Sequence, residues 1–125
     1  RSGQVGGIIG RGVWADSRLD GFAASPHILR LRPTSEEFPP GYVYAFLCLT
    51  DVGYQLLART AAGSSIPFLP LDAVLEVKIP TTPSLQQRQE IDELVKRSGA
   101  LRKQSQELEK EAVALVERAI EEGGR

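Results

Sequence analysis

The side chains that most often carry out chemistry in proteins are scarce in this chain. His27 is the only histidine and Cys48 the only cysteine. No Gly-x-Ser-x-Gly elbow is present, and no pair of carboxylates is given separate roles by its surroundings. A lone histidine without HxxxH or CxxC spacing does not indicate a metal site. The sequence therefore predicts a protein that is not an enzyme and that uses no metal and no cofactor.

The first twelve residues are a glycine-rich stretch with binding potential, and they read RSGQVGGIIGRG. Their spacing is not that of a dinucleotide fingerprint, and no Gly-Lys-Ser/Thr follows, so a phosphate-binding P-loop is excluded. The glycines either form a structural turn or let the backbone approach an anion beside Arg1 and Arg11. The residues leave these two interpretations open.

Charge is uneven along the 125 residues, although the formal net charge is only −1 and gives no overall basic field for nucleic acid. Residues 1–32 contain five arginines against two aspartates, whereas residues 33–77 contain five acidic residues against Arg59 alone. Any anion-binding face is therefore expected in the N-terminal part of the chain.

The single cysteine rules out an intrachain disulfide and fits a reducing cytoplasm, which is the expected location. No apolar stretch has transmembrane length, and no signal peptide is apparent, so no membrane is expected as a partner. The chain contains no methionine. We therefore expect a fragment or processed piece of a longer protein, with further structure before Arg1.

The elements that must position these residues form a small mixed α/β (α+β) globular domain over residues 1–83. Its expected helices are 42–50, 52–60 with Asp51 as N-cap, and 71–75. Its expected strands are 5–9, 13–15, 27–32 and 76–79. In the strand 27–32, Arg30 and Arg32 share one face, where they either contact phosphates or, as we favour, keep that face hydrated.

Residues 84–122 predict one long helix. Ser84 and Gln87 have the spacing of a capping box, and Pro80 and Pro83 stop the preceding segment. Gly123 and Gly124 supply the stop, since glycine accepts the left-handed geometry in which helices often end. Such a helix is about 57 Å long at 1.5 Å per residue, and nothing else in the chain is long enough to cover it.

A heptad pattern runs along this helix, with leucine at every d position and, after Ile91, a small residue at every a position. Small residues let two helix backbones approach closely, which favours an antiparallel pairing over a leucine zipper. The partner is either another helix of the same subunit or a second copy of the chain. The alternative is an ordinary amphipathic helix that packs on its own domain. The helix-pairing seam comprises Ile91, Leu94, Ser98, Leu101, Ser105, Leu108, Ala112, Leu115 and Ala119.

Several short stretches follow one another in a distinctive order. They are residues 1–6 (RSGQVG), 40–47 (PGYVYAFL), 63–67 (GSSIP), 71–74 (LDAV), 77–80 (VKIP) and 83–91 (PSLQQRQEI). In this order they resemble the Ser-Gly-Thr-x-Gly loop, a helix after an acidic loop, the Gly-x-Ser loop with its short helix, and the strand, turn and long conserved helix of type I restriction-modification specificity subunits. The chain departs from that family at Gln86, where glutamate is usual, and at Thr81 and Thr82, which separate two prolines that are usually adjacent.

The resemblance implies the C-terminal part of a DNA target recognition domain (1–83) followed by a spacer helix (84–122). Such a subunit reads double-stranded DNA, carries no chemistry, and docks on methyltransferase and restriction subunits. Phosphate contacts would position the domain and base contacts would specify the sequence. We expect the backbone contacts from Arg1, Ser2, Gln4, Arg11, Ser64 and Ser65, and the base contact from Arg18.

Two other interpretations remain open at this point. The chain could be a protein-interaction module, in which a small α/β head on a coiled coil binds no nucleic acid, and the nearly neutral net charge favours this. It could also be the recognition tail of a single-chain methyltransferase, although no S-adenosylmethionine site is found in these residues.

Overall fold

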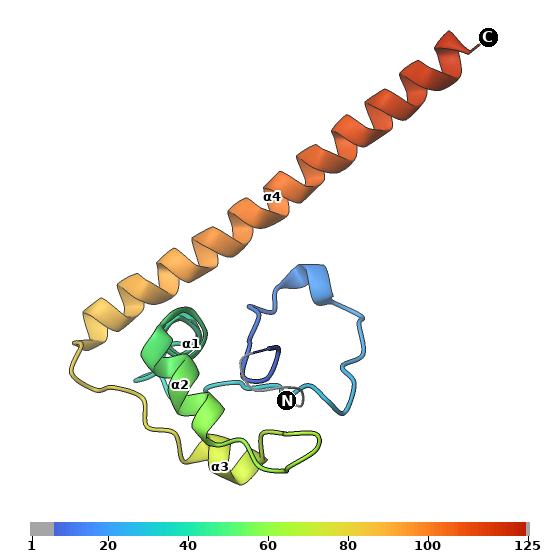
Figure 1. Cartoon of the computed structure of the whole chain (residues 1–125). Coiled ribbons are helices and arrows are strands. Elements are labelled where there is room, and N and C mark those ends of the chain that lie inside the picture. Colours follow the sequence, from blue (N-terminus) through green and yellow to red (C-terminus); the bar gives the residue numbers. More distant parts are fainter. Residues whose placement is uncertain (1–6, 125) are drawn as a thin grey trace.

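A computed structural model describes residues 7–124 of the chain. The elements follow in the order η1 (Ser17–Leu19, a 3-10 turn), α1 (Pro40–Tyr44), η2 (Ala45–Leu49, a π-helical turn), α2 (Asp51–Arg59), α3 (Leu71–Leu75) and α4 (Leu85–Gly123). Residues 7–83 form a head beside the first turns of α4, and the rest of α4 projects away from it (Figure 1). None of the helices in the described part of the chain has the length and apolar character needed to cross a membrane.

The mixed α/β fold class predicted from the sequence is wrong. Residues 7–124 contain helices but no strand and no sheet, and their β-type pairing is limited to one antiparallel bridge between Ala62 and Phe68. Residues 7–10 form a turn, and the predicted strands 13–15, 27–32 and 76–79 are irregular. Alternating apolar residues indicate a half-buried extended segment, but a strand also needs a neighbour that pairs with its backbone N–H and C=O groups.

The three short helices, in contrast, lie close to their predicted positions. Of the predicted helix 42–50, residues 42–49 are helical within α1 and η2, which begin at Pro40. Helix α2 begins and ends one residue earlier than predicted, and α3 matches the predicted range 71–75. The N-cap of α2 is Thr50 and not Asp51, because the Thr50 hydroxyl accepts a 3.0 Å hydrogen bond from the backbone N–H of Gly53. Asp51 is instead the first helical residue, where its charge complements the helix dipole.

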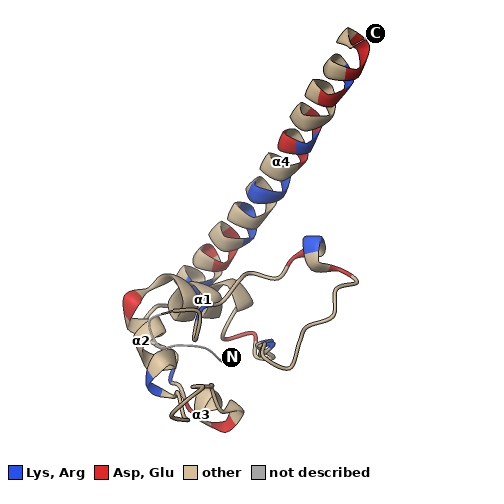
Figure 2. Cartoon of the chain, turned by 45° about the vertical axis from the view of Figure 1, so that its right-hand side comes forward, with Lys and Arg blue, Asp and Glu red and all other residues tan. Residues whose placement is uncertain are grey.

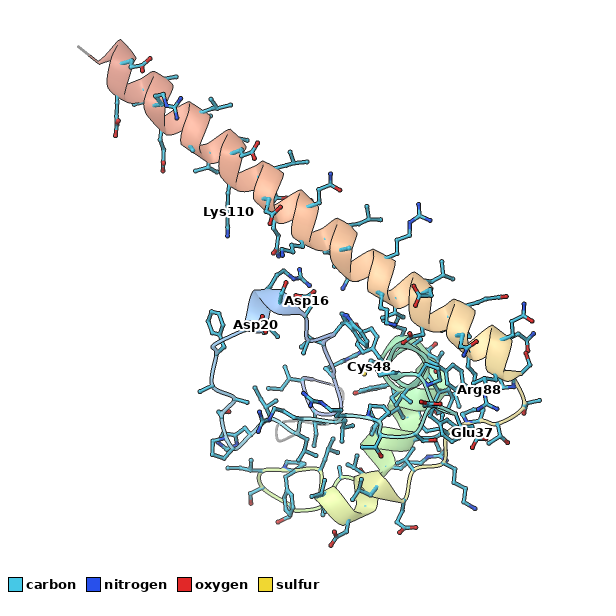
Figure 3. All side chains as sticks on the ribbon, turned by 180° about the vertical axis from the view of Figure 1, so that it is seen from behind. Asp16, Asp20, Glu37, Cys48, Arg88 and Lys110 are labelled. Carbon is cyan, nitrogen blue, oxygen red and sulfur yellow. The ribbon has the colours of Figure 1, made fainter. Side chains whose placement is uncertain are left out.

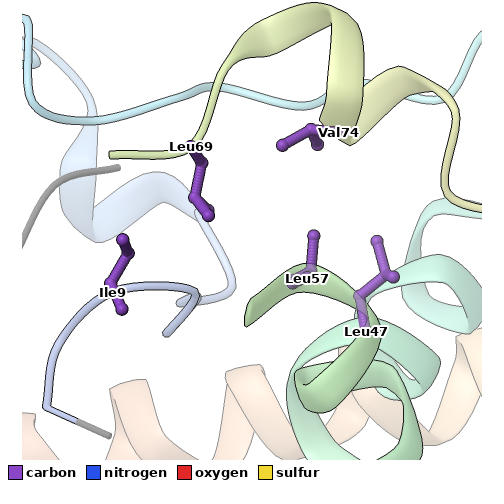
Figure 4. Packing of buried hydrophobic residues seen from close by; sticks show 5 residues of the cluster. All are labelled: Ile9, Leu47, Leu57, Leu69 and Val74. Carbon is purple, nitrogen blue, oxygen red and sulfur yellow. The ribbon is translucent and has the colours of Figure 1, made fainter. Parts of the chain in front are cut away.

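The hydrophobic core of the head is small and joins segments from distant parts of the chain (Figure 4). Ile9 from the glycine-rich turn is fully buried, and it packs with residues from η2, α2, the following loop and α3. Burial of one such aliphatic side chain contributes about 1.5–3 kcal/mol to stability. The remaining members of this cluster are Leu47, Leu57, Leu69 and Val74.

The long C-terminal helix is confirmed as α4, which has 39 residues and a length of about 58 Å. Its predicted capping box is present: Ser84 Oγ accepts from the N–H of Gln87 at 3.2 Å, and Gln87 Oε1 accepts from the N–H of Ser84 at 2.9 Å. The helix ends at Gly123, one residue later than predicted. Gly124 has φ −84°, so the end does not use the left-handed conformation expected of it.

The head is fixed to α4 through a row of four buried positions, Arg88, Asp92, Val95 and Gly99, which we call the joint. The Arg88 guanidinium donates to the carbonyl oxygens of Glu37 at 2.6 Å, Pro83 at 2.9 Å and Thr81 at 3.2 Å. Figure 3 shows Arg88 and Glu37 side by side at the start of α4. One buried arginine therefore ties two loops to the helix.

Gly99 explains how the head approaches α4 at the far end of the joint. A Cβ at this position would lie 3.2 Å from Cδ1 of Trp14, so the glycine allows the indole to lie against the helix backbone. Trp14 also contacts Tyr44, with ring centroids 5.5 Å apart. One turn further along, Lys103 Nζ donates to Ser17 Oγ at 3.1 Å and holds the loop that contains η1 against α4.

Candidate nucleic-acid interface and helix-pairing surface

The predicted DNA contacts begin in the glycine-rich stretch. Arg1, Ser2 and Gln4 lie outside the described residues. Arg11 is exposed, its Nε donates a 3.4 Å hydrogen bond to the carbonyl of Gly7, and its guanidinium lies 4.3 Å from the ring centroid of Tyr54. The aromatic face and the carbonyl orient this arginine without neutralising its charge, so it can still meet an anion.

The loop with Ser64 and Ser65 is a short turn closed by two backbone hydrogen bonds between Ala62 and Phe68, at 2.9 and 2.8 Å. Gly63 has φ +96°, a left-handed conformation that glycine adopts readily. Both serines are exposed at the tip. Their hydroxyl groups can donate to phosphate oxygens.

The core brings these two predicted contacts into one part of the head. Ile9 lies two residues before Arg11, and Leu69 follows the serine loop, and both belong to the same cluster (Figure 4). The segments that carry Arg11 and the two serines therefore pack on the same core, although they are more than fifty residues apart in the sequence.

Arg18 lies elsewhere, on the loop against α4. Its guanidinium forms an ion pair with Asp16, with Nη2 2.7 Å from Oδ2, and its Nε donates to both carboxylate oxygens. The hydrogen bonds from Arg18 hold the pKa of the Asp16 carboxyl below its usual value. Contact with a base would require Arg18 to leave this ion pair.

The seam on α4 is mostly uncovered. The leucines at the d positions are more than half exposed, with Leu94 at 65% and Leu108 at 58%. The small residues at the a positions are exposed as well, and only Ile91 is half-buried. A shallow apolar groove runs between Leu94 and Ser105 along this face. The seam is thus available for a partner helix.

The head packs on a different row of α4, at heptad positions b and e when Ile91 is taken as a and Leu94 as d. Sequence reasoning missed this row, because the heptad pattern drew attention to the leucines. Two signals were present: an apolar Val95 beside the seam, and Gly99 as a glycine in the interior of a helix, which costs about 1 kcal/mol relative to alanine and often reflects close packing.

A hollow of about 250 Å³ lies where the head, the joint and the seam meet. Its walls include the Trp14 and Tyr44 rings, Leu49 from the end of η2, and Ile91 and Leu94 from the seam. Leu49 is 60% exposed. Apolar side chains of the seam and of the head therefore line the same hollow.

Other candidate chemistry is limited. Cys48 is half-buried, and burial raises the pKa of its thiol, so it is a poor nucleophile. No three histidine, cysteine, aspartate or glutamate side chains within residues 7–124 come together in a group that could hold a metal ion.

Comparison with known proteins adds no assignment: no protein-family model, no curated protein and no solved structure matches this chain.

Proposed function

We propose that this chain is part of a DNA sequence-recognition component that resembles the specificity subunits of type I restriction-modification systems. In this role the head contacts double-stranded DNA, and α4 connects it to a second helix as a spacer. Methyltransferase subunits, with or without restriction subunits, carry the chemistry, and the assembly acts in the cytoplasm.

The observation that carries the proposal is where the resembling stretches lie in space. The residues of 40–47, 77–80 and 83–91 meet at the joint between head and helix. Tyr42 in α1 donates from its hydroxyl to the carbonyl of Pro80 at 2.8 Å, and the N–H of Gly41 donates to Asp92 at 2.6 Å. Asp92 directly follows the third stretch, so the three stretches pack together as one unit, which supports treating them as parts of one motif.

The head also offers exposed side chains that can contact DNA. Arg11, Ser64 and Ser65 are exposed on segments that share one core, and side chains of these types commonly contact phosphate oxygens. Phosphate contacts of this kind position a protein on the duplex but do not select a sequence. Selection of bases then falls to loop side chains such as Arg18.

The test is selection of duplexes from a random-sequence pool by the whole chain, first at low and then at physiological salt. A common short motif among the retained duplexes would establish sequence recognition. Retention that depends on salt but yields no motif would contradict sequence-specific recognition by this chain. Absence of retention at low salt by a folded chain would contradict DNA binding altogether.

Arg11→Ala tests the phosphate assignment. Loss of one phosphate contact reduces the slope of log K against log salt by about 0.9. Lys78→Ala is the matched control, since it removes one exposed positive charge elsewhere on the head. Equal slopes for the two variants would contradict a specific role for Arg11.

The second candidate is a protein-interaction module that binds no DNA. It is favoured by the nearly neutral net charge and by Arg18, whose charge is already paired with Asp16. In that case the pool selection retains nothing, whereas α4 still associates with a partner.

A further inference from the structure

We propose that the seam of α4 binds the α4 helix of a second copy of this chain, antiparallel and in one particular register. In this register Leu101 of each copy lies opposite Ser105 of the other, so the two-fold axis passes beside Lys103. The proposal concerns α4 alone and does not depend on DNA binding.

The first argument is the fit of large to small residues. With Leu101 opposite the partner's Ser105, every other seam layer is fixed by the heptad. One layer then pairs two large residues, and every other layer pairs a leucine with a small residue. No layer pairs two small residues, which would leave a void. The layers are Ile91 with the partner's Leu115, Leu94 with the partner's Ala112, Ser98 with the partner's Leu108, and Leu101 with the partner's Ser105.

A parallel pair in register fits less well. It would place Ser98, Ser105 and Ala112 opposite their own copies, which leaves gaps between the leucine layers. It would also place Arg97, at a g position, beside the partner's Arg102 at the following e position, and the repulsion would occur on both sides of the pair.

The second argument is charge. Residues 96–103 contain four basic residues and no acidic one, whereas residues 107–122 contain six glutamates against Lys110 and Arg118 (Figure 2). Antiparallel pairing brings the basic stretch of one helix alongside the acidic stretch of the other. A parallel pair would instead align like charges.

The g positions select the register among the antiparallel possibilities. In the proposed register Arg97 lies beside the partner's Glu111, and Glu90 beside the partner's Arg118. By symmetry the dimer has four such complementary contacts. A shift of one heptad in one direction places Arg97 beside the partner's Arg118, and a shift in the other direction places Glu90 beside the partner's Glu111. Only the proposed register avoids like charges at these g positions. At the e positions it brings Arg102 of the two copies together beside the two-fold axis, which is one repulsive contact against the four complementary ones.

A further exposed row supports the same orientation. Val113 and Ile120 at b and Val116 at e are 56%, 68% and 58% exposed, although the head lies far from them. A two-fold axis perpendicular to the helices keeps the e positions of both helices on the same side of the pair. The head sits on the b/e side of α4, so the partner's Val116, which the register places at the level of Ile91, comes to the end of the hollow that Ile91 lines.

The experiment is sedimentation equilibrium of the full chain without DNA, over a range of concentrations that spans the dimer dissociation. Arg97→Glu and Glu111→Arg each turn two attractive contacts into repulsive ones, so each is expected to raise the dissociation constant about tenfold. The double variant Arg97→Glu/Glu111→Arg restores attraction and should return the dissociation constant to within about twofold of the original.

Glu107→Arg is the matched control, because Glu107 is exposed on the same stretch of helix but lies at a c position, away from the seam. It should leave the dissociation constant nearly unchanged. A tighter dimer for Arg97→Glu would show a parallel pair or a register shifted by a heptad, and a tighter dimer for Glu111→Arg would show the opposite shift. Either result, or a chain that stays monomeric throughout, would overturn the proposal.

Discussion

The backbone N–H of Gly41 donates a 2.6 Å hydrogen bond to Oδ1 of Asp92, which joins the first turn of α1 to the second turn of α4. The second oxygen of the same carboxylate pairs with Lys96 at 2.6 Å, so Asp92 is buried but fully partnered. Together with Arg88 it fixes the direction in which α4 leaves the head. The position of the seam relative to the head depends on this contact.

Gly41→Ala should therefore destabilise the protein by about 1–3 kcal/mol, because a Cβ there would lie 2.7 Å from Oδ1 and 2.8 Å from the Cα of Asp92. The midpoint of urea unfolding, followed by circular dichroism, measures the change. Gly123→Ala is the control, since a Cβ at Gly123 meets nothing within 4 Å. A midpoint for Gly41→Ala equal to that of the control would contradict the close packing of α1 on α4.

Arg88→Lys should cost about 1–3 kcal/mol of unfolding free energy. Arg88 reaches three carbonyl oxygens from three different nitrogens and lies 5.2 Å from the ring centroid of Phe38, a geometry that a single ammonium cannot reproduce. The same urea titration measures the loss. Arg59→Lys, at an exposed position, should change the free energy by less than about 0.5 kcal/mol. Similar values for the two variants would mean that the carbonyl contacts of Arg88 contribute little.

Because the Cys48 thiol is half-buried, we expect the free energy of unfolding to decrease in alkaline solution. Burial raises the pKa of its thiol above its usual value, so the folded state keeps the proton at a pH where the unfolded chain has already released it. The unfolded state therefore gains stability as pH rises through 9 towards the higher folded pKa, and the free energy of unfolding falls.

Cys48→Ala isolates this effect from the tyrosines and lysines that also titrate in alkali. The difference in unfolding free energy between the original chain and Cys48→Ala should be constant below pH 8 and should shrink above pH 9. A difference that stays constant to pH 10 would contradict the burial of the thiol.

Much of the helical structure could be predicted from local signals. The capping box of α4 is formed by Ser84 and Gln87 alone, which are three residues apart. The start of α3 is set by Pro70, which directly precedes Leu71. The predicted helix ends differ from the observed ones by about one residue. At the start of α2, for example, both Thr50 and Asp51 have a side chain that can accept a hydrogen bond from an N-terminal N–H group, so the sequence does not decide which is the N-cap.

The absence of strands from residues 7–124 could not be predicted, because whether an extended segment becomes a strand depends on a pairing partner that the segment itself does not specify. Residues 27–32 alternate between apolar and polar, yet their backbone does not join a ladder. The candidate site divides in the same way. That the segments of Arg11 and of Ser64 and Ser65 pack on one core depends on Ile9 and Leu69, which are far apart in the sequence. The ion pair between Arg18 and Asp16 is a local contact, which charge counts over long segments conceal.

If α4 dimerises as proposed, a negative charge introduced at one of two nearby positions of α4 should weaken the dimer far more than the same charge at the other. Val116 lies at an e position, beside the partner's hollow, whereas Ala114 lies at a c position and faces solvent in the pair. Val116→Asp should raise the dimer dissociation constant at least tenfold, since an unpaired carboxylate would enter an apolar surface. Ala114→Asp adds the same charge and a residue of equally low helix propensity, so it controls for loss of helix and for net charge.

Both variants should keep the same helical content by circular dichroism above the dissociation concentration, and sedimentation then measures the difference in association. The fluorescence emission of Trp14, the only tryptophan, provides an independent signal from the hollow. Its emission should shift to longer wavelength on dilution of the original chain, as the partner's Leu108, which lies opposite Ser98 in the proposed register, leaves the hollow that Trp14 and Ser98 line. An equal loss of association in the two variants, with no change of emission on dilution, would place Val116 away from the interface, and the head would then take no part in the pairing of the helices.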